Sequence, residues 1–466
     1  MPDDAPTPPA APVWCPSARE RGDLELLLSG AYRPLTGFLG RADREAVISG
    51  GHLADERPWP VLVTLELPDE LAGGEVILTD PEGAPLARLQ VTEATPAGPG
   101  RRLVAGPLTP LATPAYGAFR RLHRRSVDVA AELAGSPVLA VVTDRPLHAA
   151  QIAALDHRAS ALAAGVLILV ATGASRSEPV VRAVLAAADR LTGATVVAAP
   201  LPNMDSPAAV LLGAHVAAAY GATHLLADHP MPGAPLPVVA SGAPSPLDEN
   251  ELDALLDAGA ALPENFTPPR VERELRRLKP PLAQRGLVVL FTGYSGSGKS
   301  TIARAVYDEL IERGDRTTTL LDGDVVRRML SAGLGFSRAD RDLNVRRIGF
   351  VAAEVARHGG FAICAPIAPY AATRADVRAM ARAAGGDFVL VWVSTPLAAC
   401  EARDRKGLYA QARAGTLTGF TGIDDPYEEP ADADLVLDTS VLPLADCAGS
   451  VLRLLTDGGW LVTPRS

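Results

Sequence analysis

Apolar and polar positions follow three successive patterns along the chain. Between residues 60 and 110, short runs such as PVLVTLELP, EVILTD and LARLQVTEA are broken by Pro-Asp, Gly-Gly and Pro-Glu-Gly turns. This pattern predicts a small β domain. From residue 136, the apolar runs PVLAVVT, VLILVAT, TVVAAPL and THLLAD alternate with helical stretches, up to a Pro/Gly-rich connector over residues 230–247. Strands and helices that alternate at this spacing predict a parallel α/β sheet.

A second α/β pattern begins at Gly286. The apolar run GLVVLFTG predicts a fully buried strand, and TIARAVYDELIERG predicts an amphipathic helix. Three further strands are expected at TTTLLDGD, GFAICAPI and DFVLVWVS, with a long helix over residues 339–358 and another at the C-terminal end. The predicted fold class is therefore α/β with a parallel sheet in the last third of the chain.

Composition and charge narrow the possible partners. The 466 residues carry a net charge of −10, whereas nucleic-acid-binding proteins usually have a basic surface. The four cysteines form no C-x-x-C pair, so neither a disulfide framework nor a zinc site is expected. MPDDAPTPPAAP lacks the features of a signal peptide, and no apolar run approaches the roughly 20 residues that span a bilayer. We expect a cytoplasmic protein with no nucleic-acid or membrane partner.

The strongest motif is GYSGSGKS at residues 293–300, which fits G-x-x-x-x-G-K-[ST] between a buried strand and an amphipathic helix. Such a P-loop wraps backbone amides round phosphates at a helix N-terminus. Lysine occurs only at positions 279, 299 and 406, so Lys299 stands out in an arginine-rich chain. We expect ATP and Mg²⁺ as cofactors, with Ser300 on the metal and ATP held by Gly293, Ser295, Gly296, Ser297, Gly298, Lys299, Ser300 and Thr301.

The acceptor side is predicted downstream of the P-loop. Asp322 and Asp324 follow a predicted strand in LLDGDVVRRML, and ligands of doubly wound sheets bind at the carboxyl ends of strands. These carboxylates are candidates to hold Mg²⁺, with Asp322 as the metal ligand, and to orient an attacking hydroxyl. A dense set of guanidinium groups suits an acceptor that carries phosphate or sulfate, and it comprises Arg327, Arg341, Arg346 and Arg347.

Residues 286–466 resemble adenylyl-sulfate (APS) kinase. The resemblance rests on the ordered motifs GYSGSGKST, LLDGDVVRRML, LGFSRADRDLNVRRIG, IAPY, KGLYAQARAGTLTGFTGIDDPYEEP and LVLDTS. It implies a P-loop kinase fold, with Lys299, Asp322, Asp324 and Lys406 as catalytic residues. It implies a nucleotide contact at Arg403 and a role for Asp425. It implies APS contacts at Arg327, Phe336, Arg341, Asn344, Ile367, Lys406 and Phe420.

Two details of this region bear on mechanism. Four glycines within residues 405–422 predict a lid that can hinge and exclude water. Ala368 occupies the position where some members of the family have a serine that is transiently phosphorylated. A phosphoenzyme at this position is excluded, and we expect direct in-line transfer.

The region before residue 286 resembles ATP sulfurylase at SGAYRPLTGFLG, GATHLL and ALPENFTPPRVERELRR, which implies a PUA-like β domain and a nucleotidyltransferase-like α/β domain. The family motif Q-x-R-N-P-x-H-x-x-H is eroded to VTDRPLHAAQ, in which Pro146 and His148 remain and Asp144 replaces an arginine. G-R-D-H-A-G is eroded to ADHPMPG, where only Asp228 and His229 match. Since sulfurylase chemistry needs cationic stabilisation, we expect this region to keep the fold without the activity.

The expected organisation is a flexible tail (1–20), a sulfurylase-type β domain (21–125), a sulfurylase-like α/β domain (130–247), a helical segment and linker (248–285) and an APS kinase domain (286–466). The expected reaction is ATP-dependent phosphorylation of the APS 3′-hydroxyl, giving 3′-phosphoadenosine 5′-phosphosulfate (PAPS). The alternatives are a bifunctional enzyme that makes PAPS from sulfate, a non-catalytic sensor, and a kinase for a related metabolite. The resemblance also implies a homo-oligomer.

Overall fold

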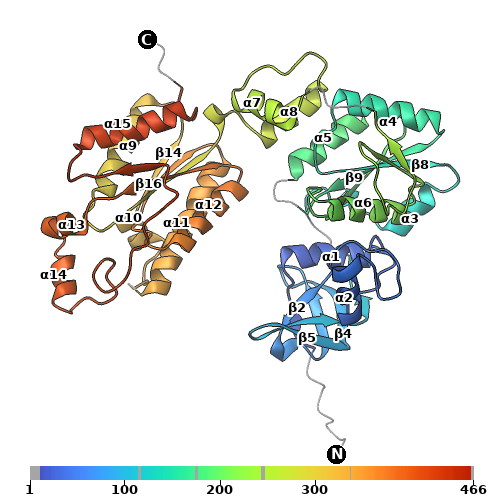
Figure 1. The fold of residues 1–466 in the computed structure, drawn as a ribbon, viewed down its shortest axis with the longest axis horizontal. Coiled ribbons are helices and arrows are strands. Elements are labelled where there is room, and N and C mark those ends of the chain that lie inside the picture. The colour runs from blue at the N-terminus through green and yellow to red at the C-terminus, as the bar shows by residue number, and fades with distance from the viewer. Residues whose placement is uncertain (1–10, 114–116, 174–176, 243–246, 336, 463–466) are drawn as a thin grey trace, which may run out of the picture. The chain divides into compact units, whose positions relative to one another are not determined.

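The computed structural model describes residues 11–113, 117–173, 177–242, 247–335 and 337–462, except for the side chain of Asp324 (Figure 1). The chain forms two compact units. The N-terminal unit comprises Met1–Asp248 and Pro263–Arg277, and the C-terminal unit comprises Glu249–Leu262 and Leu278–Ser466. The chain thus enters the C-terminal unit, returns to the N-terminal unit for one helix, and then leaves it again.

The N-terminal unit begins with a β-rich part made of two small sheets. One sheet has the order β1-β3-β4-β7 and the other β2-β6-β5, and all their pairs are antiparallel except β1 with β3. The strands are β1 (Val13–Trp14), β2 (Leu65–Pro68), β3 (Gly74–Thr79), β4 (Pro85–Val91), β5 (Glu93–Gly98), β6 (Arg101–Ala105) and β7 (Leu108–Pro110).

Helices α1 (Ala18–Leu28) and α2 (Arg41–Gly50) precede most of these strands. Helix α1 starts with a capping box, in which the Ser17 hydroxyl accepts from the Glu20 amide and the Glu20 carboxylate accepts from the Ser17 amide. Together, these bonds satisfy two donors that a helix start otherwise leaves unpaired. Within the range expected to be a tail, residues 13–14 form β1 and α1 begins at Ala18.

The rest of the N-terminal unit is a parallel sheet with the order β10-β9-β8-β11-β12. Its strands are β8 (Val138–Thr143), β9 (Gly165–Ala171), β10 (Thr195–Ala199), β11 (His224–Ala227) and β12 (Val238–Ala240). The helices are α3 (Ser126–Glu132), α4 (Ala149–Ala161), α5 (Glu178–Ala188), α6 (Pro207–Ala219) and α8 (Pro269–Leu278).

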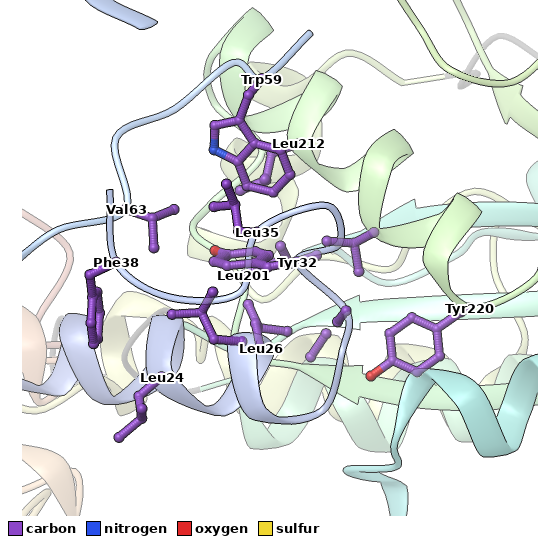
Figure 2. Close-up of a cluster of buried hydrophobic side chains, with 14 of the residues drawn as sticks. Leu24, Leu26, Tyr32, Leu35, Phe38, Trp59, Val63, Leu201, Leu212 and Tyr220 are labelled. Carbon is purple, nitrogen blue, oxygen red and sulfur yellow. The ribbon is translucent and has the colours of Figure 1, made fainter. Parts of the chain in front are cut away.

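One apolar core joins the β-rich part to the parallel sheet. Tyr32 and Trp59 meet edge to face with ring centroids 5.4 Å apart, and Trp59 packs among Leu201 and Leu212 from the α/β part (Figure 2). All four side chains are at most 1% exposed. Burying a large apolar side chain stabilises a fold by about 1.5–3 kcal/mol, so this shared core binds both parts into one unit.

The C-terminal unit is built on a second parallel sheet with the order β14-β15-β13-β16-β17. Its strands are β13 (Leu287–Thr292), β14 (Thr318–Asp322), β15 (Phe361–Ala365), β16 (Asp387–Val393) and β17 (Leu435–Leu437). The helices are α7 (Glu249–Asp257), α9 (Lys299–Arg313), α10 (Gly323–Met329), α11 (Arg338–Arg357), α12 (Ala371–Ala383), α13 (Leu397–Arg403), α14 (Leu408–Arg413) and α15 (Leu444–Asp457).

Side-chain alternation along β13 explains the layers of this unit. Every residue of β13 is buried, as expected for the central strand of a sheet covered on both faces. Val289 and Phe291 pack with α9 and α15, whereas Val288 and Leu290 pack with α11 and α12. The predicted α/β fold with a parallel sheet at the C-terminal end is confirmed (Figure 1).

Helix α7 is held to the C-terminal unit by charges. Asp253 lies 2.6 Å from the Lys279 ammonium, and Asp257 binds the Arg285 guanidinium. Among the described residues, no helix is long and apolar enough to cross a membrane.

Candidate functional site

The carboxyl ends of β13, β14 and β15 open onto one cavity of about 580 Å³. Residues from the loops that follow these strands line it, including Ser295 after β13, Gly323 after β14 and Pro366 after β15. This is the edge at which open parallel sheets bind their ligands.

The loop between β13 and α9 has the backbone of a phosphate-binding loop. Gly298 adopts φ 101°, a left-handed conformation that favours glycine, directly before the first residue of α9. At Gly293, a Cβ atom would lie only 2.4 Å from the Val393 carbonyl oxygen of the neighbouring strand. The glycines of the motif are therefore required by backbone conformation and by close strand packing.

Donors from outside the loop bind its backbone carbonyls. The Ser297 carbonyl accepts from the hydroxyls of Thr439 (2.8 Å) and Thr395 (3.1 Å). Arg403 donates to the Gly296 carbonyl (3.2 Å), and the Tyr409 hydroxyl donates to the Ser295 carbonyl (2.9 Å). These bonds hold the carbonyl oxygens outward, which favours an inward orientation of amides toward an anion.

Lys299 is the first residue of α9 and is 6% exposed. Its ammonium group donates to the Tyr294 carbonyl at 2.6 Å and lies 3.5 Å from the Ser297 hydroxyl. Ser300 and Asp322 also line the cavity, and their hydroxyl and carboxylate oxygens are the ligand types that Mg²⁺ prefers. The Asp324 side chain and Phe336 lie outside the described residues.

Arg341 and Asn344 bring buried polar atoms to the opposite side of the cavity. They lie three residues apart on α11, hence on one face of the helix, and are 7% and 4% exposed. The Arg341 Nε donor and the Asn344 Oδ1 acceptor are buried, and neither has a hydrogen-bond partner within the described part of the chain. Unsatisfied buried polar atoms are costly, so both atoms point to a ligand that would pair with them.

The rest of the Arg341 guanidinium is fixed by neighbours. It lies 2.9 Å from Asp425 Oδ2 and donates to the Thr421 hydroxyl (2.6 Å) and the Tyr370 hydroxyl (3.0 Å). Tyr370 in turn donates to Asp425 at 2.7 Å, and burial raises the pKa of this phenol to about 12. Tyr370 therefore stays protonated at neutral pH, and Asp425 orients both groups.

Residues 404–422 fold over the cavity from α13 to the segment after α14. The Asp404 carboxylate accepts from the amides of Tyr409 (3.0 Å) and Ala410 (2.9 Å), which fixes the start of α14. Phe420 is 6% exposed and meets Tyr409 edge to face, with ring centroids 5.0 Å apart. The Tyr409 hydroxyl thus anchors the predicted lid to the P-loop.

Most of the predicted site residues meet in this cavity. Its lining includes Ser295, Gly296, Gly298, Lys299, Ser300, Thr301, Asp322, Arg327, Arg341, Asn344, Ile367, Arg403, Lys406 and Phe420. Gly293, Ser297 and Asp425 support the lining without belonging to it. Two arginines of the predicted anion cluster do not line the cavity, because Arg346 pairs with Asp376 and Arg347 donates to the Leu330 carbonyl.

Sequence reasoning missed several supporting residues. Tyr370, Tyr409 and Thr421 lie within the motifs IAPY, KGLY and GFTG, so these motifs could have identified them as parts of the site. Thr395 follows β16 with no local motif, and it reaches the P-loop only through the fold.

In the N-terminal unit, side chains of the eroded motif VTDRPLHAAQ contact neighbouring residues of the same unit. Asp144 accepts from the Met204 amide at 2.8 Å, and Arg145 lies 3.8 Å from both Asp144 and Asp205. The His148 ring stacks on Phe266 with centroids 4.3 Å apart, and burial lowers its pKa to about 4. This imidazole is therefore neutral at physiological pH.

Family models match two parts of the chain: adenylylsulphate kinase over residues 285–438 and a PUA-like domain over residues 10–99. Sulfate adenylyltransferase of Mycosarcoma maydis is 32% identical, with 94% of this chain and 92% of that protein covered. The Yarrowia lipolytica enzyme of the same name is 33% identical, at 95% and 93% coverage.

Among solved structures, a hexameric APS kinase from Thiobacillus denitrificans is 34% identical and has a TM-score of 0.76, covering 97% of this chain and 94% of that one. The chain therefore belongs to the family in which a sulfate adenylyltransferase-type region precedes a nucleotide-binding adenylylsulfate kinase domain.

Proposed function

We propose that this protein transfers the γ-phosphoryl group of ATP to the 3′-hydroxyl of APS, releasing PAPS and ADP. The observation that carries the proposal is the pairing of two features in one cavity. One is a P-loop with Lys299 at its base. The other is the buried pair of Arg341 Nε and Asn344 Oδ1, which have no hydrogen-bond partner among the residues that the structure describes. The first suits a phosphate donor, and the second suits a specific polar acceptor.

The reaction needs positioning and charge neutralisation more than covalent chemistry. Lys299 would hold the β- and γ-phosphates, and Lys406 on the lid would bring a second cation to the transferred group. Asp322 would orient the APS hydroxyl. The hydroxyl oxygen forms the new bond to the γ-phosphorus, its proton passes to a carboxylate of the Asp322–Asp324 pair, and the bond from that phosphorus to the ADP oxygen breaks. Arg327, Arg341, Asn344, Ile367 and Phe420 would hold APS, and Arg403 would contact ATP.

A magnesium ion fits Ser300 and Asp322 because both residues line the cavity and both carry side-chain oxygen atoms. When bound, it would neutralise phosphate charge. Asp324 remains a proposed partner of Asp322, and Phe336 a proposed APS contact.

Ala368 supports direct transfer. It lines the cavity at the position where a serine could accept a phosphoryl group, and its methyl side chain offers no nucleophile. Transfer would then proceed in one step between the two bound nucleotides.

We further propose that the sulfurylase-type region makes no APS. Asp144 places a carboxylate where the family has an arginine, and a negative charge there opposes sulfate binding. The neutral His148 is packed against Phe266 and would not supply the positive charge that the reaction needs. The names of the fungal relatives are equally consistent with the alternative, a bifunctional enzyme that makes PAPS from sulfate.

Two parallel assays separate these functions. In the first, the protein receives APS, ATP and Mg²⁺, and PAPS formation is followed by chromatography. In the second, it receives sulfate, ATP, Mg²⁺ and pyrophosphatase. We expect PAPS in the first assay and neither APS nor PAPS in the second. Steady APS synthesis in the second would establish the bifunctional alternative.

The Lys299→Ala variant is the matched control for both assays. We expect a loss of PAPS formation of at least 100-fold, because the cation at the phosphates is removed while the remaining P-loop contacts stay. Circular dichroism should show an unchanged fold. Full PAPS formation by this variant would refute the kinase assignment, and APS binding without turnover by the unaltered protein would favour a sensor.

We also propose a homo-oligomer, since the Thiobacillus relative is described as hexameric. Light scattering after size-exclusion chromatography tests this, and a mass of one chain at micromolar concentration would contradict it.

A further inference from the structure

A buried arginine lies behind the wall of the cavity. Arg374 is on α12, is 4% exposed, and forms no ion pair with a carboxylate among the residues that the structure describes. Its Nη1 donates to the Ala368 carbonyl (2.9 Å) and its Nη2 to the Glu428 carbonyl (2.8 Å). Burial lowers its pKa, so this charge lies in an environment that disfavours it.

The two carbonyls belong to two different segments, of which only the Ala368 segment lines the cavity. Ala368 lines the cavity and has φ 46°, in the left-handed region that a residue with a Cβ disfavours. Glu428 lies beyond the Asp425 segment, and its amide donates to the Pro369 carbonyl (2.9 Å) while its carboxylate accepts from the Ala371 amide (2.6 Å). The guanidinium fork thus joins residues 367–370 to residues 425–428 at a strained turn.

These contacts continue to Arg341, which lines the cavity, and to Asp425, which binds it. Tyr370, at the end of the 367–370 segment, accepts a hydrogen bond from Arg341 and donates one to Asp425. On the other side, Arg374 lies over the Tyr427 ring, and Tyr427 packs on Tyr294 of the P-loop with ring centroids 4.9 Å apart.

We propose that Arg374 is a positioning residue for the phosphate acceptor. By bridging Ala368 and Glu428, it holds the left-handed turn and the Asp425 segment in the geometry that orients Arg341 toward APS. This inference rests on the proposed function. It identifies a contribution to acceptor affinity from a side chain that lines no part of the cavity.

The test compares Arg374→Lys with Arg374→Met in the full chain. A lysine keeps the charge but lacks the planar fork that reaches two carbonyls at once. We expect the KM for APS to rise about tenfold or more in Arg374→Lys, while the KM for ATP changes less than about twofold. Arg378→Lys, one turn along α12, is the matched control. Arg378 pairs with Asp432 and covers Phe388, so its replacement should leave both constants unchanged.

A double-mutant cycle with Ala368→Gly separates positioning from a general structural role. Glycine adopts the left-handed conformation without steric cost. In the Ala368→Gly background, we therefore expect Arg374→Lys to raise the KM for APS by at most about a third as much as it does alone. A core role unrelated to the turn would give the same increase in both backgrounds.

Three results would overturn the inference: an unchanged KM for APS in a folded Arg374→Lys variant, equal increases for ATP and APS, or no attenuation by Ala368→Gly. If Arg374→Met does not fold, the KM for APS of Arg374→Lys alone tests the inference. The unaltered protein is assayed in the same series. A lack of PAPS there would refute the proposed function itself, whereas normal PAPS with an unchanged variant would refute only the role of Arg374.

Discussion

Thr439 and Thr395 show how much of the phosphate-binding loop depends on residues outside it. Both hydroxyls donate to the carbonyl of Ser297, and Thr439 also accepts from Arg403 at 2.8 Å. A carbonyl that turned inward would repel phosphate. The two threonines therefore stabilise the backbone conformation that the anion needs.

We expect Thr439→Val to raise the KM for ATP about five- to tenfold. Losing one hydrogen bond costs about 1 kcal/mol, and 1.4 kcal/mol corresponds to a factor of ten. Ser440→Ala is the control, because that hydroxyl donates to Asp438 in its own loop and not to the P-loop in the described part of the chain. Steady-state kinetics with varied ATP checks the prediction, and an unchanged KM for ATP in a folded variant would contradict it.

At the scale of single residues, the sequence predicts those whose role is set by their neighbours along the chain. Lys299 and Ser300 follow from the motif and its flanking strand and helix. Thr439 does not, because its partner Ser297 lies 142 positions earlier, and they meet because β16 pairs with both β13 and β17. Arg374 gives no signal either, since arginine in an amphipathic helix usually faces solvent.

Among the elements, α1 contains an acid whose environment opposes its charge. Asp23 is 6% exposed and accepts from the Tyr32 hydroxyl at 2.8 Å. Burial raises the pKa of this carboxyl to about 6, from 3.8. The folded state thus holds the proton more tightly than the unfolded state, so stability falls as pH rises from about 4 to about 6 and stays lower above it.

We expect Asp23→Asn to remove this decrease and to stabilise the N-terminal unit at pH 7.5 by up to about 3 kcal/mol, the equivalent of the shift. The amide oxygen still accepts from Tyr32. Hydrogen exchange of peptides from α1, measured for both proteins at pH 4.5 and 7.5, checks this prediction. Equal exchange rates of the two proteins at pH 7.5 would show that the ionised Asp23 carboxylate does not destabilise the N-terminal unit.

Element types were more predictable than element ends. The buried run in β13 and the long helix α11 lie where the apolar pattern placed them, because periodicity directly reports burial. The start of α1 was missed because Pro-rich residues precede it, and the Ser17–Glu20 capping box carried the available signal.

For the whole molecule, the boundary of the kinase unit depends on a partly buried arginine, Arg316. Arg316 lies over the Phe361 ring and donates to the carbonyls of Leu282 (3.0 Å), Arg285 and Gly359 (3.2 Å). The boundary predicted at residue 286 stays a prediction, and a fragment cut there would leave Arg316 with only one of these acceptors.

We expect the fragment 278–466 to be more stable than the fragment 286–466. Each lost acceptor of a charged group costs about 1.5–3 kcal/mol, so the shorter fragment should melt several degrees lower. Thermal unfolding followed by circular dichroism compares the two. Arg316→Met in the longer fragment is the control, and it should remove most of the difference. Equal melting temperatures of the two fragments would place the boundary at residue 286 after all.

The path of the chain between the units limits how this architecture could be assembled. Residues 249–262 belong to the C-terminal unit, yet residues 263–277, which follow them, belong to the N-terminal unit. No single break point in the gene therefore separates two complete folding units. A recombination event at one junction would pair α7 or α8 with a foreign neighbour. We expect the two halves to be inherited as one piece, and chimaeras with related proteins to fold only when both segments are exchanged together.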